Sequence, residues 1–443
     1  MVSAAEQLVS NLNFAAFAKA DELKKRIWFT LGALLVYRLG TYIPIPGINP
    51  QALADVFRQN QSGILGMFNM FSGGAVGRMA IFALNIMPYI SASIILQLLT
   101  TVWPHLEQLK KEGEQGRRQI NQYTRYGTVM LAALQGYGIA VGLEGAGNVV
   151  LDPGWFFRIT TAITLVGGTV FLMWLGEQIT ARGVGNGISL IIMAGIVANL
   201  PHALVATLEL GRTGALSGVF ILLFLFMSVA VVAVIVFMER AQRRILVQYP
   251  KRQQGNRMFG GDASHLPLKL NTSGVIPPIF ASSLLLLPAS IAAFEPTGSS
   301  FGWIGTITAY LAHGTLLYMA LYIGLIVFFC FFYTAIVFNP AETADNLRKY
   351  GGFIPGIRPG KNTADYLDYV LTRITVFGAI YLSAVCILPE ILISQYSVPF
   401  YFGGTSLLIV VSVTMDTVAQ IHSHLLAHQY EGLIKKAKLR GRR

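Results

Sequence analysis

Ten apolar spans, each close to the length that crosses a lipid bilayer, dominate this sequence of 443 residues. The spans are 27–43, 79–103, 126–143, 156–175, 188–208, 219–238, 275–294, 316–338, 374–393 and 405–421. A helix needs about 20 apolar residues to cross the hydrocarbon core. Only 12% of the residues are charged, whereas soluble proteins carry about 25%. We therefore predict an all-α polytopic membrane protein.

Lysine and arginine fall almost entirely in alternate gaps between these spans. On the side that holds the N-terminus lie 28 of the 33 basic residues, while the opposite gaps hold only Arg58, Arg78, Arg158 and Arg212. Because basic residues accumulate on the cytoplasmic side of membrane proteins, both termini are predicted to be cytoplasmic. Large basic surfaces would then face the cytosol.

The two halves of the chain each contain five spans, so the second half is predicted to run inverted relative to the first around a central pore. The second span of each half carries proline, at Pro88 and at Pro277–Pro278. Interrupted helices at matching positions indicate the functional path, with a tolerated kink as the alternative. The predicted divisions are an arm (1–22), two halves (23–210 and 211–425), loops at 239–271 and 339–373, and a basic tail (426–443).

Two local features stand apart from the plain spans. The apolar segment Ile64 to Gly74 is far too short to cross a bilayer, and such a segment is usually re-entrant or interfacial. Polar residues gather near the two proline-bearing spans: Ser91, Ser93, Gln97, Asn271, Thr272 and Ser273. Ordinary helix–helix contacts and a seam that can part explain them equally well, since such bonds contribute only about 0.6 kcal/mol on average.

The sequence contains no catalytic constellation, so we expect no enzyme activity, no cofactor and no metal site. The glycine-rich stretch 183–187 lacks the ending of a phosphate-binding loop and is better explained as a tight cytoplasmic turn. His424 and His428 have a spacing that can bind zinc but no third ligand nearby. Cys330 and Cys386 lie inside apolar spans and are expected to be small buried hydrophobes.

Several blocks of the sequence resemble the bacterial SecY family: Met67–Gly74, Met87–Ile94, Lys111–Glu114, Gly176–Thr180, Ala344–Leu347, Phe353–Gly360 and Phe400–Ser406. The likeness runs from about Leu23 to the C-terminal tail. It implies the channel subunit of the Sec protein translocase in the bacterial inner membrane. Unfolded secretory proteins would pass through a plugged pore, and hydrophobic segments would leave through a lateral gate into lipid.

The resemblance also implies partners. SecE and SecG would be membrane subunits, and SecA or a translating ribosome would drive transport from the cytosolic face. Signal sequences and unfolded precursor polypeptides would be the ligands. Anionic lipid and membrane insertion accessory proteins are further candidates.

The same resemblance assigns roles to individual residues. The pore ring would consist of Ile86, Ile90, Ile188, Ile192, Ile279 and Ile409. The plug would lie within 61–77 and include Ile64, Leu65, Met67, Phe68, Asn69, Met70, Phe71, Ser72, Gly73 and Gly74. The lateral gate would place the polar residues named above between helices two and three and helices seven and eight. Docking of SecA or the ribosome would use Arg243, Arg244, Lys251, Arg252, Arg257 and Arg358.

Three other classes of protein remain open on the residues alone. A solute carrier fits an inverted repeat, but ion-driven carriers usually place acidic residues or histidine in the membrane. Asp416 and Arg38 are the main ionisable residues inside the spans here. A membrane enzyme would need a buried nucleophile with its base, and a structural scaffold would not need a plug-like segment.

Overall fold

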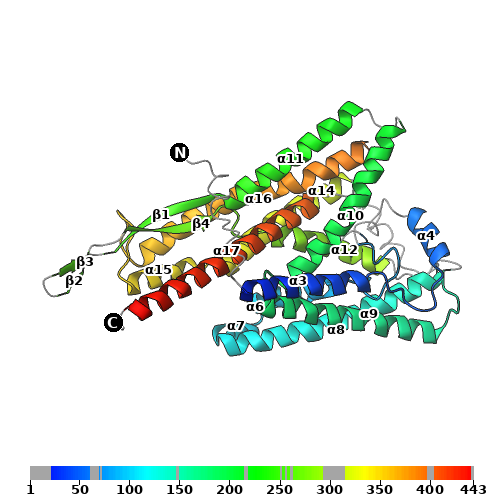
Figure 1. The fold of residues 1–443 in the computed structure, drawn as a ribbon, viewed down its shortest axis with the longest axis horizontal. Coiled ribbons are helices and arrows are strands. Elements are labelled where there is room, and N and C mark those ends of the chain that lie inside the picture. The colour runs from blue at the N-terminus through cyan, green and yellow to red at the C-terminus, as the bar shows by residue number, and fades with distance from the viewer. Residues whose placement is uncertain are drawn as a thin grey trace. The chain divides into compact units, whose positions relative to one another are not determined.

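The structure is a computed structural model that describes residues 21–59, 69, 72–145, 149–213, 218–249, 252–254, 257–259, 263–292, 315–396 and 404–440. It consists of helices and two small antiparallel sheets (Figure 1). The chain forms two compact units. The first unit comprises residues 1–202, 289–302 and 413–443, and the second comprises 203–288 and 303–412.

The predicted membrane helices are present. Among the described residues, seven helices are long and apolar enough to cross a bilayer: Glu114–Gly145, Trp155–Arg182, Gly187–Glu209, Ile221–Arg240, Leu316–Lys349, Lys361–Pro389 and Gly404–Ala427. Two shorter apolar helices, Met87–Val102 and Ile276–Leu285, correspond to the second and seventh predicted spans. The first predicted span lies largely in the helix Asp21–Gly40.

The first unit is built around a pair of long helices. Its helices are α3 (Asp21–Gly40), α4 (Pro50–Gln59), α6 (Met87–Val102), α7 (Pro104–Lys111), α8 (Glu114–Gly145), α9 (Trp155–Arg182), the start of α10 (Gly187–Arg212) and the end of α17 (Gly404–Arg440). α8 packs along α9, and α6 packs on α8 (Figure 1). Gly136 of α8 lies directly against Ala162 and Leu165 of α9. Small residues of this kind let membrane helices approach closely.

The second predicted span, 79–103, is wrong at its start. Residues 72–86 form a series of turns, and α6 begins only at Met87, with Pro88 in its first turn. Proline suits a first turn because its missing N–H has no partner to lose there. Met79 and Asn85 have φ values of 41° and 50°, which an α-helix does not contain. The turns are largely buried, and irregular backbone is tolerated at membrane depth only where protein or a water-filled cavity shields it.

These turns meet α9 at Gly168. A β-carbon added to Gly168 would lie 2.0 Å from the carbonyl oxygen of Ile81, whereas one added to the adjacent Gly167 would have no atom within 4 Å. Gly168→Ala is therefore expected to destabilise the protein by about 1–3 kcal/mol or more. The midpoint of thermal unfolding in detergent should fall. Gly167→Ala is the matched control and should leave the midpoint unchanged or slightly higher, because alanine favours helix. Equal midpoints for the two variants would contradict the close approach.

The second unit carries the remaining helices and both sheets. Its elements are the end of α10, α11 (Gly218–Arg240), β1 (Gln242–Gln248), β2 (Arg252–Gln254), β3 (Arg257–Phe259), β4 (Ala263–Lys269), most of α12 (Ile276–Ala292), α14 (Leu316–Val337), α15 (Pro340–Lys349), α16 (Lys361–Tyr396) and the start of α17. α14 packs on α16. Cys330 on α14 and Cys386 on α16 are buried, as predicted.

The loop predicted at 239–271 is a β-ribbon. β1 pairs with β4 in antiparallel register from Gln242 opposite Lys269 to Gln248 opposite Ala263, and β2 pairs with β3 further out. Ile245 and Val247 are buried, while their neighbours in β1 are exposed. Side chains alternate between the two faces of a strand, so this spacing turns one apolar face of the ribbon inward.

Candidate functional site

Four of the six isoleucines predicted to line a pore belong to the first unit. Ile86 immediately precedes α6, and Ile90 lies one turn further along. Ile188 and Ile192 have the same spacing at the start of α10. Residues four apart share one face of a helix, so the starts of α6 and α10 each present a pair of branched apolar side chains. Ile86, Ile90 and Ile192 are buried in the structure.

The other two isoleucines belong to the second unit. Ile279 lies in the first turn of α12, where its carbonyl oxygen accepts a hydrogen bond from Oγ of Ser282 at 2.9 Å. Ile409 is buried on α17. The first unit therefore holds four of the predicted isoleucines and the second holds two, at helix segments near proline or glycine. That the six side chains form one ring stays a prediction.

The start of α10 is held by the turn at 183–187 that joins it to α9. The amide of Val184 donates to Oγ1 of Thr30 on α3 at 3.0 Å, and the amide of Gly185 donates to Oε1 of Gln420 on α17 at 2.9 Å. Gly185 has a φ of 87°, which favours glycine. The predicted tight turn is confirmed, and side chains from two other helices fix it beside the isoleucine pair of α10.

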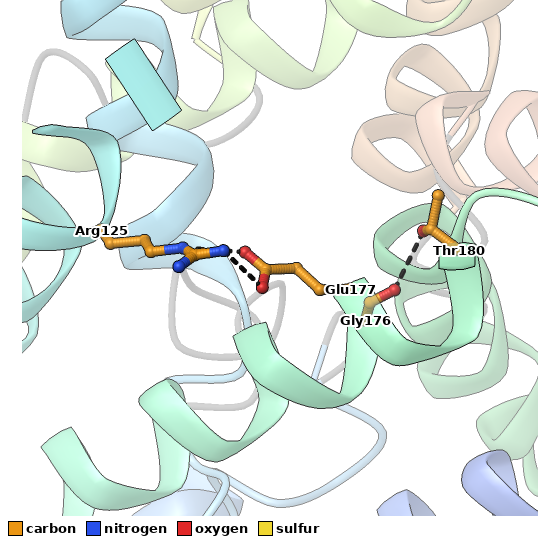
Figure 2. A network of polar contacts seen from close by, with 4 residues as sticks. All are labelled: Arg125, Gly176, Glu177 and Thr180. Carbon is orange, nitrogen blue, oxygen red and sulfur yellow. Dashed lines mark hydrogen bonds and ion pairs between the residues drawn. The ribbon is translucent and has the colours of Figure 1, made fainter. Parts of the chain in front are cut away.

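Polar contacts continue this bracing from α10 to α8. Oγ1 of Thr180 donates to the carbonyl oxygen of Gly176 at 2.9 Å (Figure 2). The same oxygen accepts from the amide of Gly187, also at 2.9 Å. Next to Gly176, the carboxylate of Glu177 forms a two-pronged pair with Arg125 of α8, at 3.0 and 2.7 Å (Figure 2). Both side chains are partly exposed, so the pair adds little stability. Its bidentate geometry nevertheless fixes how α8 and α9 meet.

Two arginines hold the segment that precedes α6. The carbonyl oxygen of Gly73 accepts hydrogen bonds from Nη1 of Arg38 at 2.7 Å and from Nη2 of Arg78 at 3.1 Å. The two guanidinium groups also lie over the ring of Tyr42, at 4.9 and 4.2 Å from its centroid. The Tyr42 hydroxyl accepts from Nη2 of Arg38 at 2.9 Å. Arg38, Arg78 and Tyr42 are named here the arginine clasp.

The clasp holds one end of the predicted plug. Six residues of that plug lie outside the described part of the chain: Ile64, Leu65, Met67, Phe68, Met70 and Phe71. Asn69 accepts from the amide of Gly74 through its carbonyl oxygen and from the amide of Gly77 through Oδ1, both at 2.7 Å. Oγ of Ser72 also donates to the carbonyl oxygen of Asn69, at 3.1 Å. This end of the predicted plug is therefore a bonded turn anchored on α3.

The polar residues predicted for a lateral gate are divided between the units. Ser91, Ser93 and Gln97 lie on α6 in the first unit. Oε1 of Gln97 is buried and has no hydrogen-bond partner among the described residues. The other three residues, 271–273, lie in the short segment before α12 in the second unit. A polar seam between the two sets stays a prediction.

The two basic loops form a single body in the second unit. Gln248 at the end of β1 exchanges two backbone hydrogen bonds with Phe353, each 2.9 Å long. An apolar core lies beneath this contact: Ile245, Val247 and Leu268 from the ribbon with Ile354, Leu367, Val370 and Ile374. We use the name basic platform for the paired strands β1 and β4 together with residues 350–360. The sequence predicted two docking loops, and the structure joins them.

Three of the arginines predicted to dock a partner are exposed on the basic platform: Arg243, Arg244 and Arg358. None of the ion pairs found among the described side chains involves these three residues. The other predicted docking residues are Arg252 in β2, Arg257 in β3, and Lys251, which lies outside the described part of the chain. Within the described part of the chain, no carboxylate forms an ion pair with these three arginines, so the platform presents their positive charge.

Comparison with known proteins identifies the family. A sequence model of the SecY family matches residues 80–418. Protein translocase subunit SecY of Rickettsia conorii is 58% identical over 424 residues, which cover 95% of this chain and 98% of that protein. The chain belongs to the SecY family. The SecY subunit of Escherichia coli K12 is 56% identical over 423 residues, which cover 95% of this chain and 96% of that protein.

SecY-family membership decides between the classes left open by the sequence. The chain is a multi-pass membrane protein of a translocase-subunit family, and it is neither an enzyme nor a solute carrier. A solved structure described as a protein conducting channel has a TM-score of 0.65 at 19% identity and covers 90% of this chain and 92% of its own. Canine Sec61 in a ribosome-channel complex has a TM-score of 0.63 at 18% identity, with the same coverage. These likenesses confirm the predicted helical fold.

Some residues that shape the SecY-family site were missed by the sequence analysis. Thr30 and Gln420 bind the α9–α10 turn, although they lie 154 and 235 residues away from their partners in the sequence. Arg78 was noted only as a charge outside the basic gaps. No local pattern predicts such contacts, because each side chain is ordinary for its own helix or turn and becomes specific only after folding.

Proposed function

We propose that this chain is the protein-conducting channel subunit of a bacterial Sec translocase. The observation that carries the proposal is the identity of 56–58% to SecY subunits over 95% of the chain. The paired isoleucines at the starts of α6 and α10 support it. In the proposed channel they form, with Ile279 and Ile409, a constriction that excludes water and ions by dewetting.

The proposed channel has two exits. A polar polypeptide leaves along the axis once the plug has moved. An apolar segment of about 20 residues leaves sideways into lipid, because Leu or Ile gains about 0.3–0.6 kcal/mol there and Lys or Asp loses about 2.5–3.5 kcal/mol. Polar bonds between membrane helices contribute about 0.6 kcal/mol on average, so a gate closed by a few of them can respond to such differences.

The basic platform is the proposed docking surface for SecA or a translating ribosome. Its exposed arginines suit the phosphates of ribosomal RNA or acidic patches on a motor protein. SecE and SecG are the proposed membrane partners, and signal sequences and unfolded precursors are the proposed ligands. Anionic lipid and membrane insertion accessory proteins are further candidates for the basic surfaces.

The proposed location is the bacterial cytoplasmic (inner) membrane, with both termini in the cytoplasm. The distribution of lysine and arginine supports this orientation, since 28 of 33 lie in alternate gaps. In this orientation the arginine clasp would lie on the exterior side and the basic platform on the cytosolic side.

A crosslinking experiment tests the channel. The chain is reconstituted with SecE, SecG, SecA and ATP, and a stalled secretory precursor is supplied. A photoreactive residue at Ile86 or Ile279 is expected to crosslink to the mature part of the precursor. The same residue at Leu222, which is 71% exposed on the apolar helix α11, should not. Transport of the precursor without a crosslink from Ile86 or Ile279 would contradict the proposed path.

A further inference from the structure

A short polar connection joins the basic platform to α12. At its start the amide of Leu270 donates to the carbonyl oxygen of Ala241 at 2.9 Å, which extends the pairing of β1 and β4 to the end of α11. Gly378 of α16 packs against the same point, because a β-carbon there would lie 3.0 Å from the carbonyl oxygen of Leu270. The hydrogen bond and the packing therefore hold Leu270, the first residue of the connection, in place.

Asn271 follows in this connection and has all the polar atoms of its side chain occupied within the second unit. Nδ2 donates to Oε1 of Glu239 at 2.6 Å and to the carbonyl oxygen of Gly274 at 3.0 Å, while Oδ1 accepts from Oγ of Ser273 at 3.1 Å. An ionised carboxylate and a carbonyl group only accept hydrogen bonds, so they fix the orientation of the amide. Asn271 is 5% exposed, and its side chain needs no partner from the other unit.

Glu239 occupies an unfavourable place for its own helix. It lies in the last turn of α11, where the negative end of the helix dipole disfavours a carboxylate. Its hydrogen bond to Asn271 is charge-assisted, and such bonds are roughly twice as strong as those between neutral groups. The contacts continue from Ser273 to Sγ of Cys330 on α14, at 3.8 Å. The carboxylate of Glu239 is unfavourable for α11 itself. Its hydrogen bond to Asn271 therefore points to a role in the connection to α12 rather than in the helix.

We infer that Glu239 is a positioning residue for α12. Its carboxylate holds Asn271 and so fixes the start of α12 to the end of α11 and to the base of the platform. The inference rests on the proposed function, in which α12 is a gate helix. It replaces the predicted role of Asn271 as a partner across the seam with a role as a link inside its own unit. A protein that binds the platform would act on the start of α12 through this link.

Hydrogen–deuterium exchange on the reconstituted complex tests the link itself. Glu239→Ala is expected to accelerate exchange about tenfold at residues 279–281, the first amides of α12 after Pro277–Pro278, because a hydrogen bond to a charged group is lost. Glu239→Gln keeps an acceptor oxygen and should accelerate exchange less. Glu342→Ala removes an exposed carboxylate on α15 and should have no effect there. Unchanged exchange in Glu239→Ala would overturn the inference.

Export of precursors with signal sequences of graded hydrophobicity tests the consequence for the gate. Glu239→Ala, Asn271→Ala and the double variant are expected to change the hydrophobicity required for export by the same amount, because residues that act as one link are not additive. Binding of SecA to the platform should stay unchanged in all three. A change in Asn271→Ala that is absent from Glu239→Ala would show that Asn271 acts across the seam, and the inference would be wrong.

The crosslink at Ile279 separates this inference from the proposed function. If a photoreactive residue at position 279 does not crosslink to a transported precursor in the complex that keeps Glu239 and Asn271, the proposed gate fails. The exchange measurement does not depend on transport, so it still decides whether Glu239 fixes the start of α12.

Discussion

Arg358→Glu is expected to stop SecA-driven transport of a precursor into proteoliposomes while assembly with the membrane partners stays intact. Arg358 is exposed on the basic platform, and Oγ1 of Thr363 donates to its carbonyl oxygen at 3.0 Å, which holds the backbone in place. Like charges brought together in an interface cost several kcal/mol. A loss of about 3 kcal/mol lowers affinity more than a hundredfold, so the motor should no longer remain bound.

Two controls accompany this variant. Lys110→Glu makes the same change of charge at an exposed position on α7, which is not part of the platform, and transport should persist. Arg358→Lys keeps the charge but lacks the planar fork of arginine, so partial activity is expected. Normal transport by Arg358→Glu would refute docking at this residue, and loss of assembly would show that the residue is structural.

The double variant Ile86→Gly, Ile279→Gly is expected to raise the ion conductance of the resting channel in planar bilayers severalfold. The two substitutions remove branched apolar side chains from the proposed constriction, and a wider or wetter constriction no longer blocks ions by dewetting. The conductance is measured without precursor or motor, so that an open channel does not contribute.

The chain offers matched controls for this measurement. Ile95→Gly changes the same residue type on α6, the helix that follows Ile86, at a position that is 42% exposed, and it should not raise the conductance. Ile86→Val with Ile279→Val keeps branched apolar side chains and should preserve the seal. Equal conductance for the glycine double variant and the unsubstituted protein would count against the isoleucine ring.

The membrane helices could be predicted from the sequence because apolar length is a local property. The spans at 156–175 and 316–338 lie almost entirely within α9 and α14, for example. Residues 79–86 are equally apolar but form turns, because Pro88 starts the helix and the backbone packs on Gly168. That outcome depends on a tertiary contact, which hydropathy does not contain.

The site was predictable to a similar degree. The β-branched residues Ile245 and Val247 at alternate positions favour a strand, and they could have predicted β1 within the basic loop. The junction of Gln248 with Phe353 could not be predicted, since it pairs backbone groups from distant segments. The link from Glu239 to Asn271 escaped for the same reason, because each residue alone resembles an ordinary polar residue near a helix end.

The arginine clasp fixes the point at which the predicted plug is attached to the first unit. Asn69 is bonded to the turn that the clasp fixes on α3, so in the proposed channel the plug moves about that point. An extended chain spans at most about 3.3–3.6 Å per residue. A residue five positions before Asn69 can therefore lie no further than about 18 Å from it. Reclosure is then an intramolecular event at the high effective concentration that a short tether imposes. The seal can return quickly after each polypeptide even if the plug binds its seat weakly.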